Sequence, residues 1–419
     1  MKKIILYLTI VLLTIIGTSC KDYVTNVDPL IDRTEDANLN NEDQVPFLVA
    51  GVQTYASNSL TENAVLSDGL SDLFYFDPRI RNATYPQYEE IDAGLIPTDN
   101  NSVRGAYTHL GRLRKLADTL VYRVLNNITF TDESVKAGAL FIGYFYGGYA
   151  RMVYASEYGS SQLTGGSPID GGKFIPSATL YKNAIDKFMA ALPYGSSSEK
   201  RVVNSLIAKC YLYLADYANA ATYANQGMDQ TDLPYDLLYS DLLNNYYYQQ
   251  AGVGRHQWGV DQRMLDYINA DSTEAARIPM YTEIYRGYQA WFQDKYPDRG
   301  SSYSLMTWQE NYLMRAELSL RGQDSGDPLT LVNEVRDSHI YTSPTTHLNY
   351  HIPPLTSVVL YSDDHSVGNI YDERDKELCF TGNRLADERR FNEFHLGSSG
   401  TYWEYLPITI DELNTNTNL

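Results

Sequence analysis

Residues 371–394 read YDERDKELCFTGNRLADERRFNEF, a highly charged stretch near the C-terminus. The pattern predicts two charged helices with an apolar seam through Leu378 and Phe380 and a break at Gly382. Acidic and basic side chains recur here at helical spacing, so we expect them to form an ion-pair lattice that fixes the fold and to have no ligand role. The residues concerned are Glu373, Arg374, Glu377 and Arg384.

Upstream of this stretch, apolar residues recur at intervals of three and four over long segments. Residues 102–228 predict a series of helices joined by short connections, which implies antiparallel helical hairpins. Another helix is expected after the capping residues Asn40 to Asp43, through Phe47 and Val52.

One of these hairpins has a recognisable repeat pattern. Residues 204–227, NSLIAKCYLYLADYANAATYANQG, resemble a tetratricopeptide repeat, a helix-turn-helix unit of about 34 residues. Ala208 and Ala220 take positions where small side chains let the two helices approach closely. A weaker second instance lies near 305–337. The sequence therefore predicts a mainly α fold, in which tetratricopeptide-like hairpins near 102–228 and 305–337 pack with a loop-rich, irregular ligand-binding face.

The N-terminus has the order of a secretory signal. A basic head precedes an apolar run over residues 4–16, which is shorter than the ~20 residues of a membrane-spanning helix. Small residues and Cys20 follow, and this ending resembles a bacterial lipobox. We therefore expect a lipoprotein signal peptide over 1–19 and a lipid on Cys20. An ordinary signal peptide with an incidental cysteine, or a membrane anchor, are the alternatives.

Charge restricts the partners of the chain. The formal net charge is −19, which disfavours nucleic-acid binding and adsorption to anionic lipid. Membrane attachment then depends on lipid at Cys20 alone. Residues 20–45 are polar, acidic and without periodicity, so they are predicted to form a flexible tether that leads to a single domain over 46–419.

Two irregular segments carry aromatic residues in patterns that suggest a binding face. The chain has 37 Tyr, 12 Phe and 4 Trp, and tyrosine offers a flat apolar ring with a polar rim. Residues 68–100 and 234–300 are rich in Pro, Gly and such rings. Tyr281, Tyr285, Tyr288 and Trp291 show helical spacing, which predicts a core position for at least two of them. The candidate ligand-binding residues are Phe74, Tyr75, Tyr85, Tyr246, Tyr247, Tyr248, Trp258 and Trp291.

Motifs of catalysis and of metal or phosphate binding are absent from the sequence. It contains no HExxH, CxxC, GK[ST] loop or GxSxG elbow. His347 and His351 are four residues apart, but Pro353 and Pro354 follow and argue against a helix that would present a zinc pair. The sequence therefore predicts neither an enzyme nor a resident metal or cofactor.

Taken in order, these features resemble the SusD/RagB family, the nutrient-binding outer-membrane lipoproteins of Bacteroidetes. The C-terminal pattern departs from that family at Thr381, where Glu is usual, and at Leu385, where Trp or Phe is usual. Residues 137–156, which run into a Glu157–Tyr158–Gly159 turn, also fit the pattern. The other matching residues are Asp28–Pro29, Asp372–Glu373–Arg374, Glu377–Leu378–Cys379–Phe380, Gly382, Arg384, Leu406–Pro407–Ile408, Glu412 and Asn418–Leu419.

The resemblance implies a non-catalytic lipoprotein of the outer membrane that faces the exterior. Such a protein captures oligosaccharide by aromatic stacking and passes it to a TonB-dependent SusC-like transporter, with a site built from the early loop and the middle irregular segment. Three other hypotheses stay open at this stage. They are the same architecture with peptide cargo, a secreted glycoside hydrolase of helical-barrel type, and a helical scaffold that binds only protein.

Overall fold

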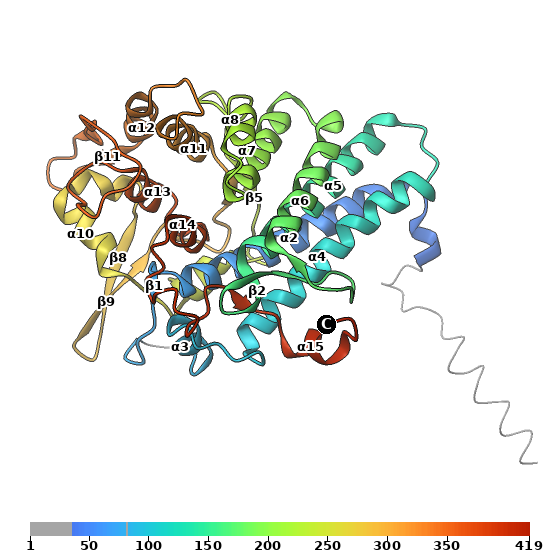
Figure 1. The fold of residues 1–419 in the computed structure, drawn as a ribbon, viewed down its shortest axis with the longest axis horizontal. Coiled ribbons are helices and arrows are strands. Elements are labelled where there is room, and N and C mark those ends of the chain that lie inside the picture. The colour runs from blue at the N-terminus through green and yellow to red at the C-terminus, as the bar shows by residue number, and fades with distance from the viewer. Residues whose placement is uncertain (1–35, 81–82) are drawn as a thin grey trace, which may run out of the picture.

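The computed structural model describes residues 36–80 and 83–419 (Figure 1). The predicted signal peptide, Cys20, Asp28–Pro29 and the tether up to residue 35 lie outside the described residues. Within the described part of the chain, no helix combines the length and the apolarity needed to cross a bilayer.

The fold is mainly α-helical, as the sequence predicts. Short 3-10 helices cover Asp36–Leu39, Glu42–Gln44, Leu192–Tyr194 and Ser272–Ala276. The α-helices are α2 (Val45–Leu70), α3 (Gln87–Asp92), α4 (Asn101–Asn126), α5 (Glu133–Glu157), α6 (Ser177–Ala191), α7 (Ser197–Tyr213), α8 (Tyr217–Ala224), α9 (Tyr246–Ala251), α10 (Gln262–Ala270), α11 (Trp308–Leu320), α12 (Pro328–Asp337), α13 (Ile370–Glu377), α14 (Arg384–Phe391) and α15 (Ile410–Thr415).

The strands are short and form small separate sheets. The largest has the order β13-β2-β3-β4, in which β13 is parallel to β2 and brings the C-terminal segment back onto the end of α5. The other pairs are β1–β7, β5–β10, β8–β9 and β11–β12, all antiparallel. The strands are β1 (Phe74–Tyr75), β2 (Tyr158–Ser161), β3 (Thr164–Ser167), β4 (Ile175–Pro176), β5 (Tyr235–Leu237), β6 (Arg255–His256), β7 (Gly259–Val260), β8 (Met280–Tyr285), β9 (Tyr288–Gln293), β10 (Tyr303–Met306), β11 (Ile340–Thr342), β12 (Asn349–His351) and β13 (Leu406–Pro407).

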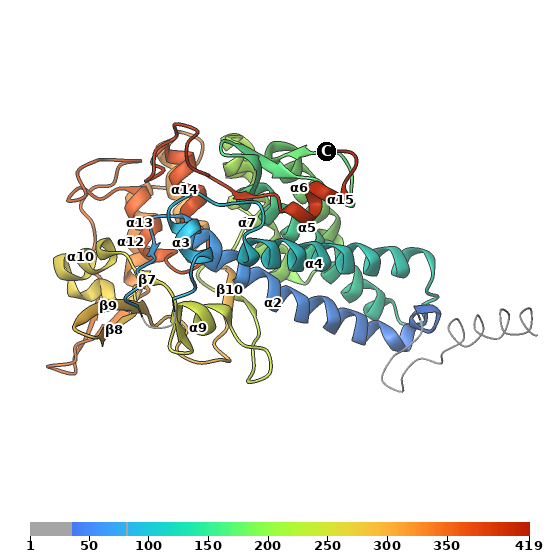
Figure 2. The same ribbon diagram turned by 90° about the horizontal axis from the view of Figure 1, so that it is seen from below.

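Long helices make up one half of the molecule. α4, α5 and α6 pack in succession and α2 lies across α4 and α5 (Figures 1 and 2). Asn100 caps the start of α4, and its side chain accepts hydrogen bonds from the backbone N–H groups of Ser102 and Val103. Its apolar positions at intervals of three and four, such as Leu110, Leu113 and Ala117, are fully buried. The spacing therefore identifies the buried face of this helix correctly.

The predicted helical hairpins are present. α7 and α8 pack together, and Ser196 forms a capping box with Glu199 at the start of α7. Ala208 and Ala220, the small residues at the helix contact, are completely buried. α11 and α12 form the second hairpin within the predicted range 305–337.

The described end of the predicted tether is not extended. Residues 36–44 contain two 3-10 helices and pack near the loop between α4 and α5. Arg123 of α4 donates a hydrogen bond to Asn40 at 2.7 Å, and Glu42 accepts the backbone N–H groups of Thr131 and Asp132 at 2.9 and 2.8 Å. These polar contacts explain why residues 36–44 are folded without apolar periodicity.

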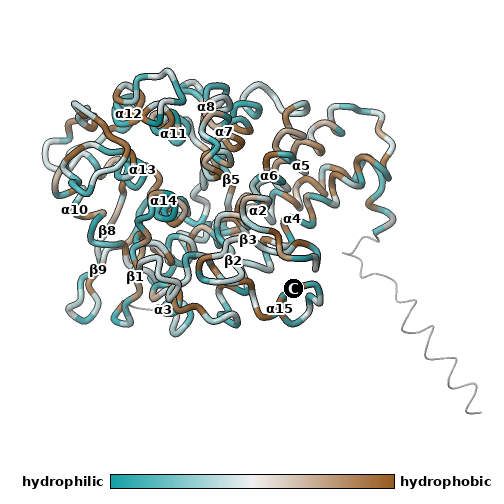
Figure 3. Tube along the Cα trace, in the orientation of Figure 1, coloured by the Kyte–Doolittle hydropathy of each residue, from teal (hydrophilic) through white to brown (hydrophobic). Residues whose placement is uncertain are grey.

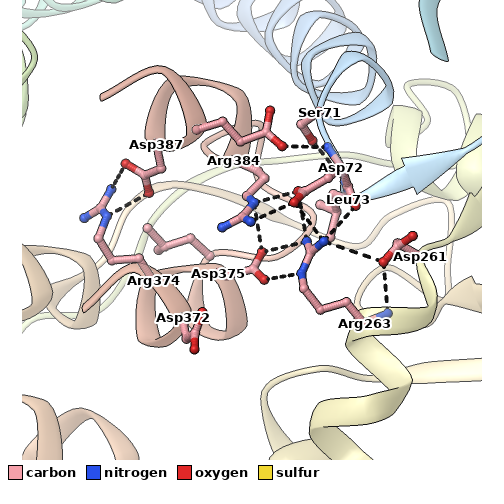
Figure 4. A network of polar contacts seen from close by, with 12 residues as sticks. Ser71, Asp72, Leu73, Asp261, Arg263, Asp372, Arg374, Asp375, Arg384 and Asp387 are labelled. Carbon is pink, nitrogen blue, oxygen red and sulfur yellow. Dashed lines mark hydrogen bonds and ion pairs between the residues drawn. The ribbon is translucent and has the colours of Figure 1, made fainter. Parts of the chain in front are cut away.

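The charged segment 371–394 forms α13 and α14 at the centre of a buried ion-pair lattice (Figure 4). Figure 3 shows both helices as largely hydrophilic. Arg374 is completely buried, and its Nε donates to Asp387 at 2.8 Å. Arg384 donates to Asp72 at the end of α2, at 2.7 and 2.8 Å. The predicted ion-pair lattice is therefore confirmed, and it extends beyond residues 371–394.

A second part of the lattice surrounds Glu373. Its carboxylate accepts from Arg277 at 2.9 Å and from Arg336 of α12 at 2.8 Å. Burial opposes ionisation of Glu373, but the charges of Arg277, Lys376 and Arg336 outweigh it and hold the pKa well below its usual range. The same balance between burial and Arg374 and Arg390 lowers the pKa of Asp387 to about 2. Both carboxylates are therefore ionised at neutral pH inside the protein.

Removing one side of a buried pair should be far more costly than removing one side of an exposed pair. We expect Arg374→Met to lower the free energy of unfolding by about 3 kcal/mol, because Asp387 stays buried with less compensation. The matched control is Arg104→Met, which breaks the half-exposed pair with Asp411 and should cost less than about 1 kcal/mol. Chemical denaturation followed by circular dichroism measures both values. Equal losses for the two variants would contradict a structural role of the lattice.

Candidate ligand-binding site

The early loop and the middle segment meet at one edge of the molecule. β1, which follows α2, pairs with β7, with Phe74 opposite Val260 and Tyr75 opposite Gly259. β7 in turn contacts β9. At Gly259 a Cβ atom would lie 2.3 Å from the Tyr75 ring, so the absence of a side chain lets this ring lie against the strand. The structure thus brings together the two aromatic-rich segments.

The middle segment contributes a β-hairpin made of β8 and β9. Its turn is Arg286–Gly287, with φ of 50° and 85°, and the flanking residues Tyr285 and Tyr288 are paired. A two-residue turn with both φ values positive matches the right-handed twist of a hairpin. The helical spacing predicted for Tyr281, Tyr285, Tyr288 and Trp291 is therefore wrong, because these residues lie on two antiparallel strands.

Strand alternation separates the side chains of the hairpin into two faces. Paired residues share a face, so Tyr281 and Phe292 lie on the same side as Tyr285 and Tyr288, whereas Trp291 lies on the other side. Ile80, Ala290 and Phe292 form a small core of their own, against which Tyr75, Tyr281, Tyr285 and Tyr288 pack. The hairpin is thereby attached to the loop that follows β1.

A pocket of about 640 Å³ lies between this loop and the end of the hairpin. Its volume is in the range of small-molecule sites. The lining residues are Pro78, Arg79, Ile80, Ile284, Tyr285, Arg286 and Tyr288.

Neighbouring polar groups hold the ring of Tyr288 in place. The Arg79 guanidinium carbon lies 3.8 Å from the ring centroid, a cation–π contact. Arg79 Nε donates to the two Asp77 oxygens at 2.9 and 3.1 Å, and this hydrogen bonding lowers the pKa of Asp77. The Tyr288 hydroxyl is 3.1 Å from the Tyr75 hydroxyl, and burial together with this contact raises the pKa of Tyr75. The ring is therefore positioned at its hydroxyl and over its face.

His256 holds the other tyrosine of the pocket. Its Nδ1 is 2.6 Å from the Tyr285 hydroxyl and its Nε2 is 2.7 Å from the Tyr281 hydroxyl. A neutral imidazole has one donor and one acceptor nitrogen, so one tyrosine donates to it and the other accepts from it. The imidazole also packs on Phe292, with ring centroids 4.4 Å apart. These contacts hold the side chain of Tyr285 in place.

Three of the predicted ligand-binding residues are core residues. Trp258 is completely buried and stacks on Tyr88 and Phe74, with centroids 4.6 and 6.2 Å away. Tyr247 is also completely buried and donates its hydroxyl to Asp68 at 2.6 Å. Other aromatic rings cover these faces, so no sugar can stack on them in this structure. The ligand role predicted for Phe74, Tyr247 and Trp258 is therefore corrected to a structural one.

The other predicted residues occupy different places. Tyr75 borders the pocket through its contact with Tyr288. Tyr85 is 70% exposed and Tyr248 is partly exposed, and neither lines the pocket. Tyr246 is half-buried, and Trp291 packs against the main core from the opposite face of the hairpin. A ligand role for these residues stays a prediction.

The sequence does not predict four of the residues that line this candidate site, namely Arg79, Tyr285, Arg286 and Tyr288. The signal for the hairpin is Gly287, a turn residue between two short runs that are rich in aromatic and β-branched residues. Positions 281, 285 and 288 also satisfy a helical period, which hides the strand pattern.

A second hollow, of about 340 Å³, lies between α6, α7 and α14. Arg389 contributes to its lining and donates hydrogen bonds to backbone carbonyls of Ser156 and Glu404. Its aromatic residues are Tyr181, Tyr213 and Tyr405. Among the described residues, no group of three or more His, Cys, Asp and Glu side chains could hold a metal ion, in either hollow or elsewhere.

No protein-family profile matches the sequence, and no curated protein matches it. Solved structures do match the fold. A SusD superfamily protein from Bacteroides vulgatus has a TM-score of 0.70 at 15% identity, covering 89% of this chain and 97% of its own. Surface glycan-binding protein A from Bacteroides thetaiotaomicron has a TM-score of 0.67 at 13% identity, covering 91% and 98%. NanU of B. fragilis has a TM-score of 0.68 at 16% identity, covering 94% and 98%. The chain therefore has the SusD-like fold, as the resemblance in sequence implied.

The assignment of Trp258 to the core makes a stability prediction. We expect Trp258→Ala to lower the free energy of unfolding by about 3–5 kcal/mol, because it leaves a cavity among Phe74, Tyr88 and their neighbours. The exposed Tyr85→Ala should change it by less than about 0.5 kcal/mol. Denaturant unfolding of both variants is the measurement. A Trp258→Ala protein as stable as the wild type would contradict the assignment of this residue to the core.

Proposed function

We propose that this chain, a protein with the SusD-like fold, is a non-catalytic surface protein that captures oligosaccharide by aromatic stacking. The observation that carries the proposal is the pocket at the β8–β9 hairpin, where Tyr285 and Tyr288 are held side by side next to two arginines. In this proposal the captured glycan then passes to a TonB-dependent SusC-like transporter of the outer membrane.

The chemistry of the pocket fits a sugar. The C–H faces of a pyranose ring are apolar and its rim carries hydroxyls, so aromatic rings edged by hydrogen-bond donors suit it. Tyr285 and Tyr288 supply rings that are partly exposed, and Arg286 supplies donors at the mouth. The polar contacts of Tyr288 and Tyr285 with Arg79 and His256 restrict ring motion before a ligand arrives, which lowers the entropic cost of binding.

The name of one matched structure, a surface glycan-binding protein, supports glycan as the ligand class. Peptide cargo is the alternative, because tyrosines and arginines also bind peptides. A glycoside hydrolase would need a pair of carboxylates at the scissile bond. The lining residues that the structure describes include no carboxylate, so this pocket favours binding over hydrolysis.

The location follows from the N-terminal sequence. A lipid on Cys20 would anchor the chain in the outer membrane, facing the exterior. Residues 36–44 pack against the α4–α5 region, so fewer residues separate the anchor from the folded body than the predicted tether of 20–45 would provide. A short connection would keep the body near the membrane, where a transporter partner would lie.

The stacking role is tested by Tyr288→Ala in affinity gel electrophoresis against a panel of polysaccharides. Loss of one stacked ring should weaken retention by about 1 kcal/mol or more, or at least about fivefold in affinity. Tyr122→Ala is the matched control, because this tyrosine is 60% exposed on α4 and lies outside the pocket. If a folded Tyr288→Ala protein is retained as strongly as the wild type, the hairpin is not part of the ligand site. Binding of peptides without any retention by glycan would show that the cargo is peptide and not oligosaccharide.

The anchor is tested with Cys20→Ala expressed in a bacterium that processes lipoproteins. Without the thiol no lipid can be attached, so the chain should stay unprocessed or be released in soluble form. Membrane fractionation and mass spectrometry of the N-terminus provide the measurement. A processed Cys20→Ala protein that still sediments with the membrane would refute the lipid anchor.

A further inference from the structure

The hairpin pocket differs in charge from the chain around it. The whole chain has a formal net charge of −19, yet the described residues that line the pocket include two arginines and no carboxylate. A neutral sugar does not require this arrangement, because hydroxyls are bound equally well by amides and carboxylates.

The two arginines have different surroundings. Asp77 binds the Arg79 side chain through three hydrogen bonds and neutralises its charge, so Arg79 serves to hold the Tyr288 ring. Arg286 has no such partner: among the described residues, no carboxylate oxygen lies within ion-pairing distance of its guanidinium. Glu283 is three residues earlier on β8, and its charge acts on Tyr281. Arg286 is therefore the uncompensated cation of the pocket.

The backbone conformation at position 286 is one that arginine rarely adopts. Its φ is 50°, in the left-handed region, where Asn and Gly are favoured and other residues are uncommon. The second turn position is Gly287, which fits this rule. Arginine thus occupies a site where turn chemistry alone would select Asn or Gly. A residue that contradicts the local preference is typical of a functional position.

We propose that the pocket is specific for acidic glycans. Arg286 binds an anionic substituent, either the carboxylate of a sugar acid or a sulfate ester, while the sugar ring packs beside Tyr285 and Tyr288. The planar guanidinium suits both groups, because it donates two parallel hydrogen bonds to a pair of oxygens. This assignment rests on the proposed glycan-binding function and names the ligand class.

The test compares acidic oligosaccharides with neutral partners of the same backbone. One arm pairs oligogalacturonates with their methyl esters, a second pairs sialyllactose with lactose, and a third pairs sulfated with desulfated chondroitin oligosaccharides. Titration calorimetry at about 0.15 M salt limits long-range repulsion by the acidic chain to about 8 Å. We expect the wild type to bind an acidic member at least about fivefold more tightly than its neutral partner. The arm that shows the preference identifies carboxylate or sulfate.

Arg286→Asn is the decisive variant. Asparagine fits the turn, so the protein should fold with an unchanged or higher melting temperature. Its acidic-to-neutral affinity ratio should fall to about one, because only the acidic partner loses a charged contact. Arg112→Gln removes one positive charge from an exposed position on α4 and should preserve the ratio, which separates a local contact from net charge.

The outcomes distinguish this inference from the proposed function. Tyr288→Ala should weaken acidic and neutral members alike, because stacking does not depend on charge. If the wild type binds neutral members as well as acidic ones, or if Arg286→Asn keeps the acidic preference, acidic specificity is refuted while glycan binding stands. If no member of any arm binds, acidic specificity is refuted, and retention in the polysaccharide panel decides whether glycan binding stands.

Discussion

The ion pairs of Asp72 with Arg263 and Arg384 connect the core to the candidate site. Asp72 lies just after α2 and two residues before β1, and Arg263 lies at the start of α10, just after β7. Arg384 of α14 completes the contact from the C-terminal segment (Figure 4). The lattice therefore holds the ends of the two strands whose pairing places Tyr75 beside the hairpin. A charged, hydrophilic pair of helices is buried because its charges are matched, and the matched charges in turn specify where β1 and β7 lie.

The two parts of the molecule have different physical requirements. In the lattice, burial would keep carboxyl groups neutral unless arginines lay within hydrogen-bond distance. The relative positions of the elements that carry the paired charges are therefore strongly specified. Among the described residues no arginine pairs with Asp68, and burial raises its pKa to about 8 while Tyr247 and Gly382 donate hydrogen bonds to it. The pocket, in contrast, lies on a two-stranded hairpin at the surface, attached through a small core of its own. Its turn can carry a residue that local preference disfavours, because the lattice and the helical core supply the stability.

Most of the scaffold could be predicted from the sequence, and most of the site could not. Helical periods identify α2, α4, α5 and the α7–α8 hairpin, and alternating charges identify the lattice, since both patterns are local. The burial of an aromatic residue is decided by distant neighbours: Trp258 is covered by Phe74 and Tyr88, which are far away in sequence. The hairpin pocket lies between the early loop and the middle segment, from which the sequence predicts a site, but its rings are Tyr285 and Tyr288 rather than Trp258 and Tyr247. The tyrosines of the hairpin also fit a helical period, so the pocket cannot be recognised from the sequence.

A crystal structure of the chain bound to an oligosaccharide that it retains would test the central claim, that the hairpin pocket is the ligand site. We expect density for a sugar ring in contact with Tyr285 or Tyr288, with a polar substituent directed at Arg286. A sugar bound instead in the hollow between α6, α7 and α14, against Tyr181, Tyr213 and Tyr405, would contradict the assignment.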